Sequence, residues 1–238
     1  MTADRWTQQV RNQLGLGRIL ALGGPRDGAW ITEAAAGAVL RRAMAREPGA
    51  RLVSLRIALA DPQAAGRAAV ERPPSALPPG PLRVSARLAA IAAQPLPATA
   101  ERVRRTLAGA ARELGLAVAE VDLRVTELLD GAPAGAEAER PVAPRPAAVA
   151  GDDTDEVRAA EAVRSVPGVD CLTAVLGRPV HIGTHARHGS ALPQRHVRVE
   201  FAAGGGRPVL EVARDVRAAV RDALPDRPTA AVLVTSVG

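Results

Sequence analysis

The sequence predicts an α+β fold of two similar small modules, each with a short sheet packed against two helices, joined by a Pro/Ala-rich tether. The first observation is an apolar stripe at helical spacing that occurs twice. Its members are Val103, Leu107, Ala110 and Leu114 in the first copy and Val212, Val216, Ala219 and Ala223 in the second. The second observation is that each stripe leads, at the same separation, into a strand-like run, residues 121–126 and 232–235. A repeat of this size indicates a duplicated module.

The distribution of Pro and Ala divides the chain into segments. Between residues 131 and 151, Pro alternates with Ala and charged residues, which is typical of an extended, weakly structured tether. We therefore expect four segments. They are a polar leader over residues 1–17, a first module over 18–130 with a Pro-rich insertion over 61–81, a linker over 131–151 and a second module over 152–238.

The elements of the first module follow from turn residues and periodicity. Residues 18–22 predict a short strand, and Thr32 is the expected N-cap of a helix that continues to Arg46. A strand over 52–59 places on one side Val53, Leu55, Ile57 and Leu59. The Pro-rich insertion cannot form a ladder and is expected to loop out. A strand over 82–88, the helix of the first stripe and its closing strand favour a parallel pair joined by a crossover.

The second module repeats this order. Asp155 and Glu156 suit the N-terminus of a helix whose apolar positions are Val157, Ala160 and Val163. The next strand alternates charged residues with Val197, Val199 and Phe201. The three consecutive glycines at 204–206 then turn the chain toward the helix of the second stripe.

Composition excludes several mechanisms. All 31 basic residues are Arg, and a chain without Lys has no P-loop lysine, pyridoxal Schiff base or lysine general base. Three aromatic residues, Trp6, Trp30 and Phe201, cannot supply the stacking platforms of single-strand or RNA-binding proteins. The single Cys171 excludes an intramolecular disulfide and fits a reducing compartment.

The sequence shows neither a signal peptide nor a membrane-spanning segment. The first ten residues lack a basic start followed by an apolar core. Arg, Glu or Pro interrupts every apolar run before it reaches the roughly 20 residues needed to cross a bilayer. We therefore expect a soluble, cytoplasmic protein.

Two short motifs carry a resemblance to a known family. The first copy closes with residues 115–123, Gly-Leu-Ala-Val-Ala-Glu-Val-Asp-Leu, and the second ends its first helix with residues 166–169, Val-Pro-Gly-Val. In these motifs the chain resembles the alkaline shock protein family of envelope stress response proteins, over about residues 30–129 and 155–238. The resemblance implies small α+β cytoplasmic proteins that associate with each other, reach the membrane through a separate anchor protein and have no known catalysis.

The departures from this family pattern differ between the copies. The first copy has Glu-Pro-Gly-Ala at residues 47–50, and the second has Pro-Asp-Arg-Pro at 225–228 where the closing-strand motif belongs. The chain is therefore expected to be a divergent tandem relative. It also resembles chains named after a nucleopolyhedrovirus fibre protein, but a coiled-coil fibre needs sustained heptads, and the helices expected here are short and broken by Pro.

An arginine face is the strongest polar feature that the two copies share. Arg105 and Arg112 of the first striped helix correspond to Arg214 and Arg221 of the second, and all four lie opposite the apolar stripe. Such a face suits an acidic partner, a phosphate-rich polymer or anionic lipid headgroups. The alternative is a solvated helix face, supported by ion pairs such as Glu101 with Arg105.

A histidine cluster offers the only spacing that suggests a metal site. Its members are His181, His185 and His188, and imidazole ligates zinc or nickel. Gly183 and Gly189, however, predict a flexible loop, which would not hold the ligands in place. The alternative is a solvent-exposed loop, and we assign no metal, cofactor or catalytic residue.

These observations predict a non-enzymatic cytoplasmic scaffold or adaptor, acting in envelope stress through a membrane-anchored protein partner, with self-association as a further expectation. The duplication doubles a binding surface, and a flexible tether raises the effective concentration of the second module once the first has bound. The alternative is a basic protein that binds nucleic acid non-specifically through the same helix faces. The net charge of +6 supports this alternative only weakly, because a GC-rich genome by itself enriches Arg.

Overall fold

The computed structural model describes residues 17–131, 145–149, 154–185 and 194–238, and in these ranges the chain is an α+β protein, which confirms the predicted class. Its helices are α2 (Glu33–Met44), α3 (Leu96–Leu114), α4 (Thr154–Arg164) and α5 (Val209–Ala223). Its strands are β1 (Ile19–Leu22), β2 (Ala29–Thr32), β3 (Ala50–Leu59), β4 (Leu82–Ile91), β5 (Val118–Leu129), β6 (Val169–Leu172), β7 (Val180–His185), β8 (Gln194–Ala203) and β9 (Thr229–Val237). None of the described helices is long and apolar enough to span a membrane.

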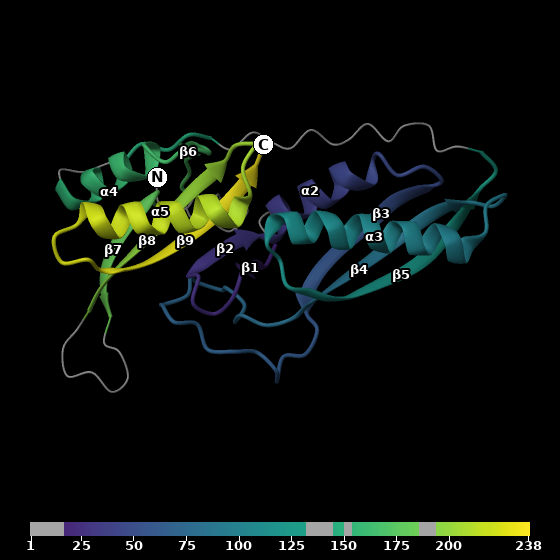
Figure 1. Cartoon of the computed structure of the whole chain (residues 1–238), viewed down its shortest axis with the longest axis horizontal. Helices are drawn as coiled ribbons and strands as arrows, with labels where there is room; N and C mark the ends of the chain where they lie inside the picture. The colour runs from purple at the N-terminus through teal and green to yellow at the C-terminus, as the bar shows by residue number, and fades with distance from the viewer. Residues whose placement is uncertain (1–16, 132–144, 150–153, 186–193) are drawn as a thin grey trace, which may run out of the picture.

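The strands form two sheets, and the helices lie together on one side of them (Figure 1). The smaller sheet has the order β3-β4-β5, with β3 antiparallel and β5 parallel to β4. The larger sheet has the order β1-β2-β9-β8-β6, and β7 also pairs with β8. In this sheet β6 and β7 are antiparallel and β9 is parallel to β8. A helix crossover, α3 or α5, therefore joins a parallel pair in each sheet, as the sequence predicts.

The first hairpin does not stay with the sheet that follows it in sequence. β1 and β2 pair antiparallel, and β2 then pairs in parallel with β9, near the opposite end of the chain. Trp30 and Ile31 of β2 are 1% and 0% exposed, because one faces each side of the larger sheet. The sequence analysis begins the first module at residue 18. The strand pairing instead places residues 19–32 in the sheet of the C-terminal strands.

One apolar core runs through both halves of the chain. It includes Leu40 of α2, Leu107 of α3, Phe201 of β8 and Val216 of α5. α2 supplies the connection, because it packs against α3 on one side and against β9 on the other. The two halves are thus packed together; most of the predicted tether, residues 131–151, lies outside the described residues.

The helix stripes are confirmed in α3 and shifted in α5. All four predicted positions of α3 are buried. In α5, Val212 and Val216 are buried and Ala219 packs half-buried against the core, but the next fully buried position is Val220, and Ala223 is only half-buried. Val220 is four positions after Val216, so it lies on the same helix face and presents the larger apolar side chain.

The residues that β3 buries differ from those that the predicted alternation places on one side. Leu55 and Ile57 are buried as expected, whereas Val53 is 45% exposed. The pairing of β3 with β4 shifts register between Leu52 and Ser54, so Val53 is an extra residue at a β-bulge. Because a bulge reverses the alternation that follows it, Val53 faces away from the core.

The Pro-rich insertion packs on the larger sheet instead of looping out. The N–H of Leu77 donates to the carbonyl of Ile19 at 2.8 Å, and the N–H of Ala69 donates to Pro25 at 2.9 Å. Val70 joins Trp30 and Leu233 in a small apolar cluster on the sheet face opposite the helices. Pro prevents the segment from forming a regular ladder, but the N–H of Leu77 still satisfies one carbonyl at the edge of β1.

Replacing Ile31 by Ala is expected to lower the free energy of unfolding of the whole chain by about 3 kcal/mol, because it opens a cavity in the strand that joins the two halves. Urea unfolding followed by tryptophan fluorescence and by circular dichroism should give one shared transition that moves to lower urea. Val53→Ala, at an exposed position, is the control and should cost little. Two transitions, one of them unmoved by Ile31→Ala, would contradict the shared core.

Candidate functional site

The helices α3 and α5 form one row across the helical side of the molecule (Figure 1). α3 ends at Leu114, and its C-cap Gly115 adopts a left-handed conformation with φ of 88°. A Cβ at this position would lie 2.8 Å from the Cβ of Leu210 in the first turn of α5. A glycine therefore allows the C-terminus of α3 to abut the start of α5. The exposed residues of both helices consequently belong to one continuous surface.

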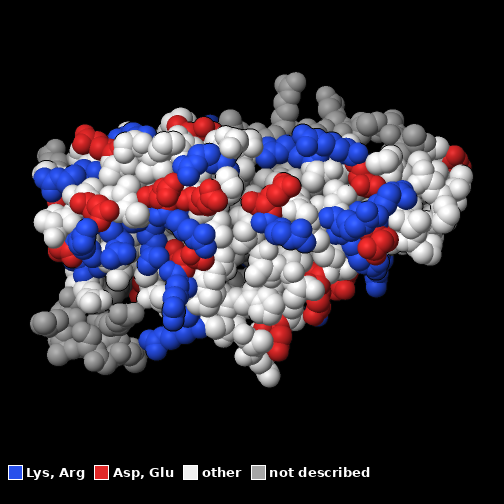
Figure 2. Space-filling model, viewed as in Figure 1, with Lys and Arg blue, Asp and Glu red and all other residues white. Residues whose placement is uncertain are grey.

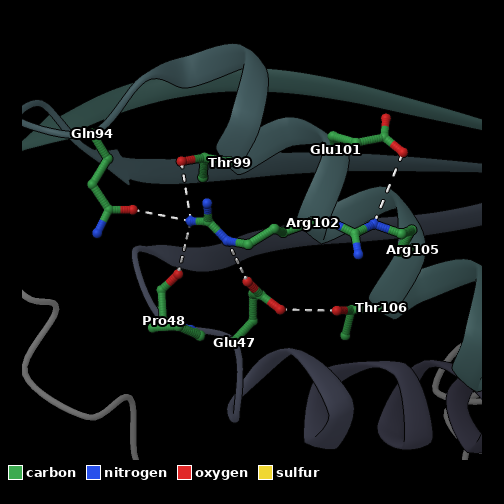
Figure 3. Close-up of polar contacts among 8 residues, drawn as sticks. All are labelled: Glu47, Pro48, Gln94, Thr99, Glu101, Arg102, Arg105 and Thr106. Atoms are coloured by element: carbon green, nitrogen blue, oxygen red, sulfur yellow. Dashed lines mark hydrogen bonds and ion pairs between the residues drawn. The ribbon is translucent and has the colours of Figure 1, made fainter.

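This surface carries the four predicted arginines, and the structure divides them into two kinds. Arg105 lies 4.0 Å from Glu101 of its own helix (Figure 3), and Arg214 donates through Nε to Asp27 at 2.9 Å. Arg112 and Arg221 are exposed, and neither has an ion pair within the described residues. The second pair is therefore available to a partner without the loss of an internal contact.

Asp27 and Arg217 fasten the β1–β2 turn to α5. Although burial raises the pKa of Asp27, hydrogen bonds from Arg214 and from the N–H of Gly24 lower it below its ordinary value overall. Arg217 donates to the carbonyls of Arg26, Asp27 and Ala230 at 2.8, 3.1 and 3.1 Å. Burial lowers the pKa of Arg217, and its charge is held by these carbonyls. Arg214 is thus part of a structural contact between hairpin and helix.

A second structural arginine lies on α3, one turn before Arg105 (Figure 3). Arg102 donates through Nε to Glu47 at 3.0 Å and through Nη2 to the side chain of Gln94 at 3.0 Å. Thr106 donates to the other oxygen of Glu47 at 2.9 Å. Only 11% of the Glu47 side chain is exposed, so the network fixes the turn between α2 and β3 against α3. The sequence analysis did not single out Arg102, since its partner is 55 positions away.

Acidic residues interrupt the arginines of the helical face. Figure 2 shows red and blue side chains intermixed over this side of the molecule. On α5, Asp215 binds Arg207 at 2.9 Å, and Asp222 binds Arg227 at 2.9 Å. Intermixed charges weaken attraction to a uniformly charged polymer, because each phosphate would meet carboxylates as well as guanidinium groups.

The predicted histidine cluster is only partly described. His181 lies in β7 opposite Arg198, so a paired strand replaces the loop predicted there, and its side chain is exposed. The side chain of His185 and the whole of His188 lie outside the described residues. In the described ranges no group of three or more His, Cys, Asp or Glu side chains is placed to hold a metal ion. A metal site that includes these histidines stays an untested alternative.

A cavity of about 900 Å³ lies between the Pro-rich insertion and the ends of β8 and β9. Its polar side chains include Arg67, Arg72, Ser75, Gln194, His196 and Thr229. His196 is 6% exposed, and its Nδ1 lies 2.8 Å from the hydroxyl of Thr229. No local sequence pattern indicates this cavity, because the packing of residues 66–78 on the sheet creates it.

The larger sheet also buries a carboxyl group that the sequence analysis did not identify. Glu200 of β8 is 0% exposed and accepts a hydrogen bond from the N–H of Leu176 at 3.0 Å. Burial raises its pKa to about 7, although Arg198, whose Nε lies 3.6 Å from Oε1, opposes the shift. The Nε1 of Trp30, the Nε of Arg198 and the Oε1 of Glu200 have no hydrogen-bond partner in the described part of the chain. These three atoms lie on the sheet face opposite the helices.

No family model, curated protein or solved structure matches this chain. The resemblance to the alkaline shock protein family therefore stays a prediction from the two motifs.

Replacing Glu200 by Gln is expected to remove a pH dependence of stability. In the native chain, the free energy of unfolding should fall as pH rises from about 4.5 to about 7, because the unfolded chain releases this proton while the folded chain retains it. Across this window the loss should be on the order of 3 kcal/mol. Urea unfolding at pH 5 and pH 8 measures it, with the exposed Glu113→Gln as control. Equal pH dependence in the native chain and Glu200→Gln would contradict the assignment.

Proposed function

We propose that this protein is a non-enzymatic scaffold or adaptor that binds an acidic surface of a protein partner through the row formed by α3 and α5. The observation that carries the proposal is the exposed, unpaired state of Arg112 and Arg221 on that row, within the described residues. Guanidinium groups that hold no internal carboxylate can bind a partner's carboxylates in a bidentate manner. Following the family resemblance, the partner would be a membrane-anchored protein of the envelope stress response.

The mixed charge of the helical face favours a folded protein partner over nucleic acid. Asp215 and Asp222 lie on the same helix as Arg221, so a matching surface must present both signs at set positions. A folded partner can do this, whereas a duplex presents only phosphates. The described helices do not span a membrane, and in this proposal the membrane is reached through the partner.

Charge reversal at Arg112 and Arg221 tests the proposal. We expect Arg112→Glu/Arg221→Glu to reduce crosslinked partner, recovered from the native membranes and quantified by mass spectrometry, by about tenfold or more. Because neither side chain has an internal ion pair in the described ranges, the thermal unfolding midpoint should change little. Arg67→Glu/Arg164→Glu changes net charge equally at two exposed positions outside α3 and α5 that have no ion pair in the described ranges, and is the matched control.

Two outcomes would contradict the proposal. One is recovery of the same crosslinked proteins with both double variants and the native chain. The other is tight binding of duplex DNA, lost in Arg112→Glu/Arg221→Glu and weakened steeply by salt, since counterion release would then identify a nucleic-acid surface.

A further inference from the structure

One edge of the smaller sheet has no neighbouring strand among the described residues. β5, the last strand in the order β3-β4-β5, is 12 residues long and pairs only with β4 among the described strands. An edge strand of this length presents a row of backbone N–H and C=O groups that another strand can bind. β5 contains no Pro, which would block such pairing, and its charged residues, Glu120, Asp122, Arg124 and Glu127, include both signs.

β9 is the strand of the larger sheet that corresponds to β5, and a further strand pairs with its edge. β9, like β5, follows a helix crossover and lies parallel to the preceding strand. Its other edge is covered by β2, which pairs with residues 232–234. The hairpin that covers β9 has no counterpart beside β5 in the described part of the chain. The described smaller sheet therefore ends at β5, whereas the larger sheet continues beyond β9 through β2 and β1.

β5 exposes apolar side chains and a charged side chain that an added strand could cover or pair. Val125 is 37% and Leu128 57% exposed, two of the five large apolar side chains that the described chain exposes to this degree. Arg124 is exposed and has no ion pair within the described residues, whereas Asp122 lies 3.4 Å from Arg83 and keeps 63% of its side chain exposed. Burial of Val125 and pairing of Arg124 would both favour an added strand.

We propose that the occupant of this edge is a second copy of the same chain, with the two β5 strands antiparallel and centred on Leu123. A two-fold axis perpendicular to the sheet makes paired strands antiparallel and keeps the helices of both copies on one side. In this register Asp122 lies opposite the partner's Arg124, and Arg124 lies opposite the partner's Asp122. Val121 and Val125 likewise lie opposite each other on the face toward α3.

The charge pattern selects this register over its neighbours. Centring on Asp122 would place that carboxylate opposite its own copy, and centring on Arg124 would oppose two guanidinium groups. Like charges directly opposite in a sheet are unfavourable. A slip by one residue would bring core-facing side chains against outward-facing ones. The pairing of β5 with β4 shifts after Val125, which limits the regular ladder to residues 121–125. We therefore expect a reversible dimer with a micromolar dissociation constant.

Charge reversal with rescue tests the pairing in the full chain. The native protein should have twice the 24.6 kDa mass of one chain in size-exclusion chromatography with light scattering at high micromolar concentration. Arg124→Asp places two carboxylates opposite each other at both symmetric positions and should raise the dimer dissociation constant about tenfold or more. Asp122→Arg/Arg124→Asp restores opposite charges and should recover the dimer. Arg164→Asp, at an exposed position of α4 away from β5, makes the same change of charge and is the control that should leave the dimer intact.

A cysteine crosslink tests the register. In a Cys171→Ser background, Leu123→Cys should form an intermolecular disulfide on mild oxidation, because residues opposite each other in an antiparallel pair bring their Cα atoms within disulfide range. Glu127→Cys should not, since it lies far from its own copy in this register. A native chain that stays monomeric at these concentrations would overturn the proposal. So would a dimer that survives Arg124→Asp or that crosslinks at position 127 and not at 123.

This inference does not depend on the proposed function. The dimer uses the edge of β5, and the partner surface uses the exposed face of α3 and α5. Arg112→Glu/Arg221→Glu should therefore keep the mass of the native dimer, and Arg124→Asp should still recover the crosslinked membrane partner.

Discussion

The parallel pairing of β2 with β9 is the constraint on which the rest of this fold depends. It places residues 29–31 beside 232–234 and so brings the first described strands of the chain into the sheet formed by the last. Thr32 then begins α2: its hydroxyl accepts the N–H of Ala35 at 3.2 Å and lies 3.4 Å from the carbonyl of Thr235. Because α2 begins at this point, it is directed across the end of β9 and can pack on α3, which joins the two sheets into one core.

Arginine performs two distinct tasks in a chain that has no Lys. Arg102 and Arg217 reach carbonyl and carboxylate oxygens of other elements and hold turns against helices. Their planar guanidinium groups suit this, because one side chain donates several hydrogen bonds in fixed directions. Arg112 and Arg221 have no such contact in the described ranges and face solvent. The distinction matters for function, since a partner can use the second kind without disrupting the fold.

The two sheets differ chiefly at their edges. The larger sheet has both sides of β9 paired, and the Pro-rich insertion shields part of β1 through Leu77. The smaller sheet ends in β5, whose apolar and charged residues remain exposed. The order helix, strands, helix, strand occurs in both halves but leads to different surfaces. Residues outside that order, such as the hairpin before α2, decide which edge is covered. The buried carboxyl of Glu200 likewise exists only where segment 173–176 covers the larger sheet.

Local pattern determined the α+β class, the Thr32 cap, the buried stripe of α3 and the parallel crossovers, because helical and strand periodicity are properties of neighbouring residues. It also identified four of the five exposed arginines of α3 and α5, all except Arg104. It could not show that Arg214 is held by Asp27, that Val53 lies on a bulge or that β2 belongs beside β9. Each of these depends on a contact between residues distant in sequence, and periodicity carries no information about which distant strand or turn a segment will meet. Only the packed tertiary structure, in which every buried polar group and strand edge must find a partner, decided them.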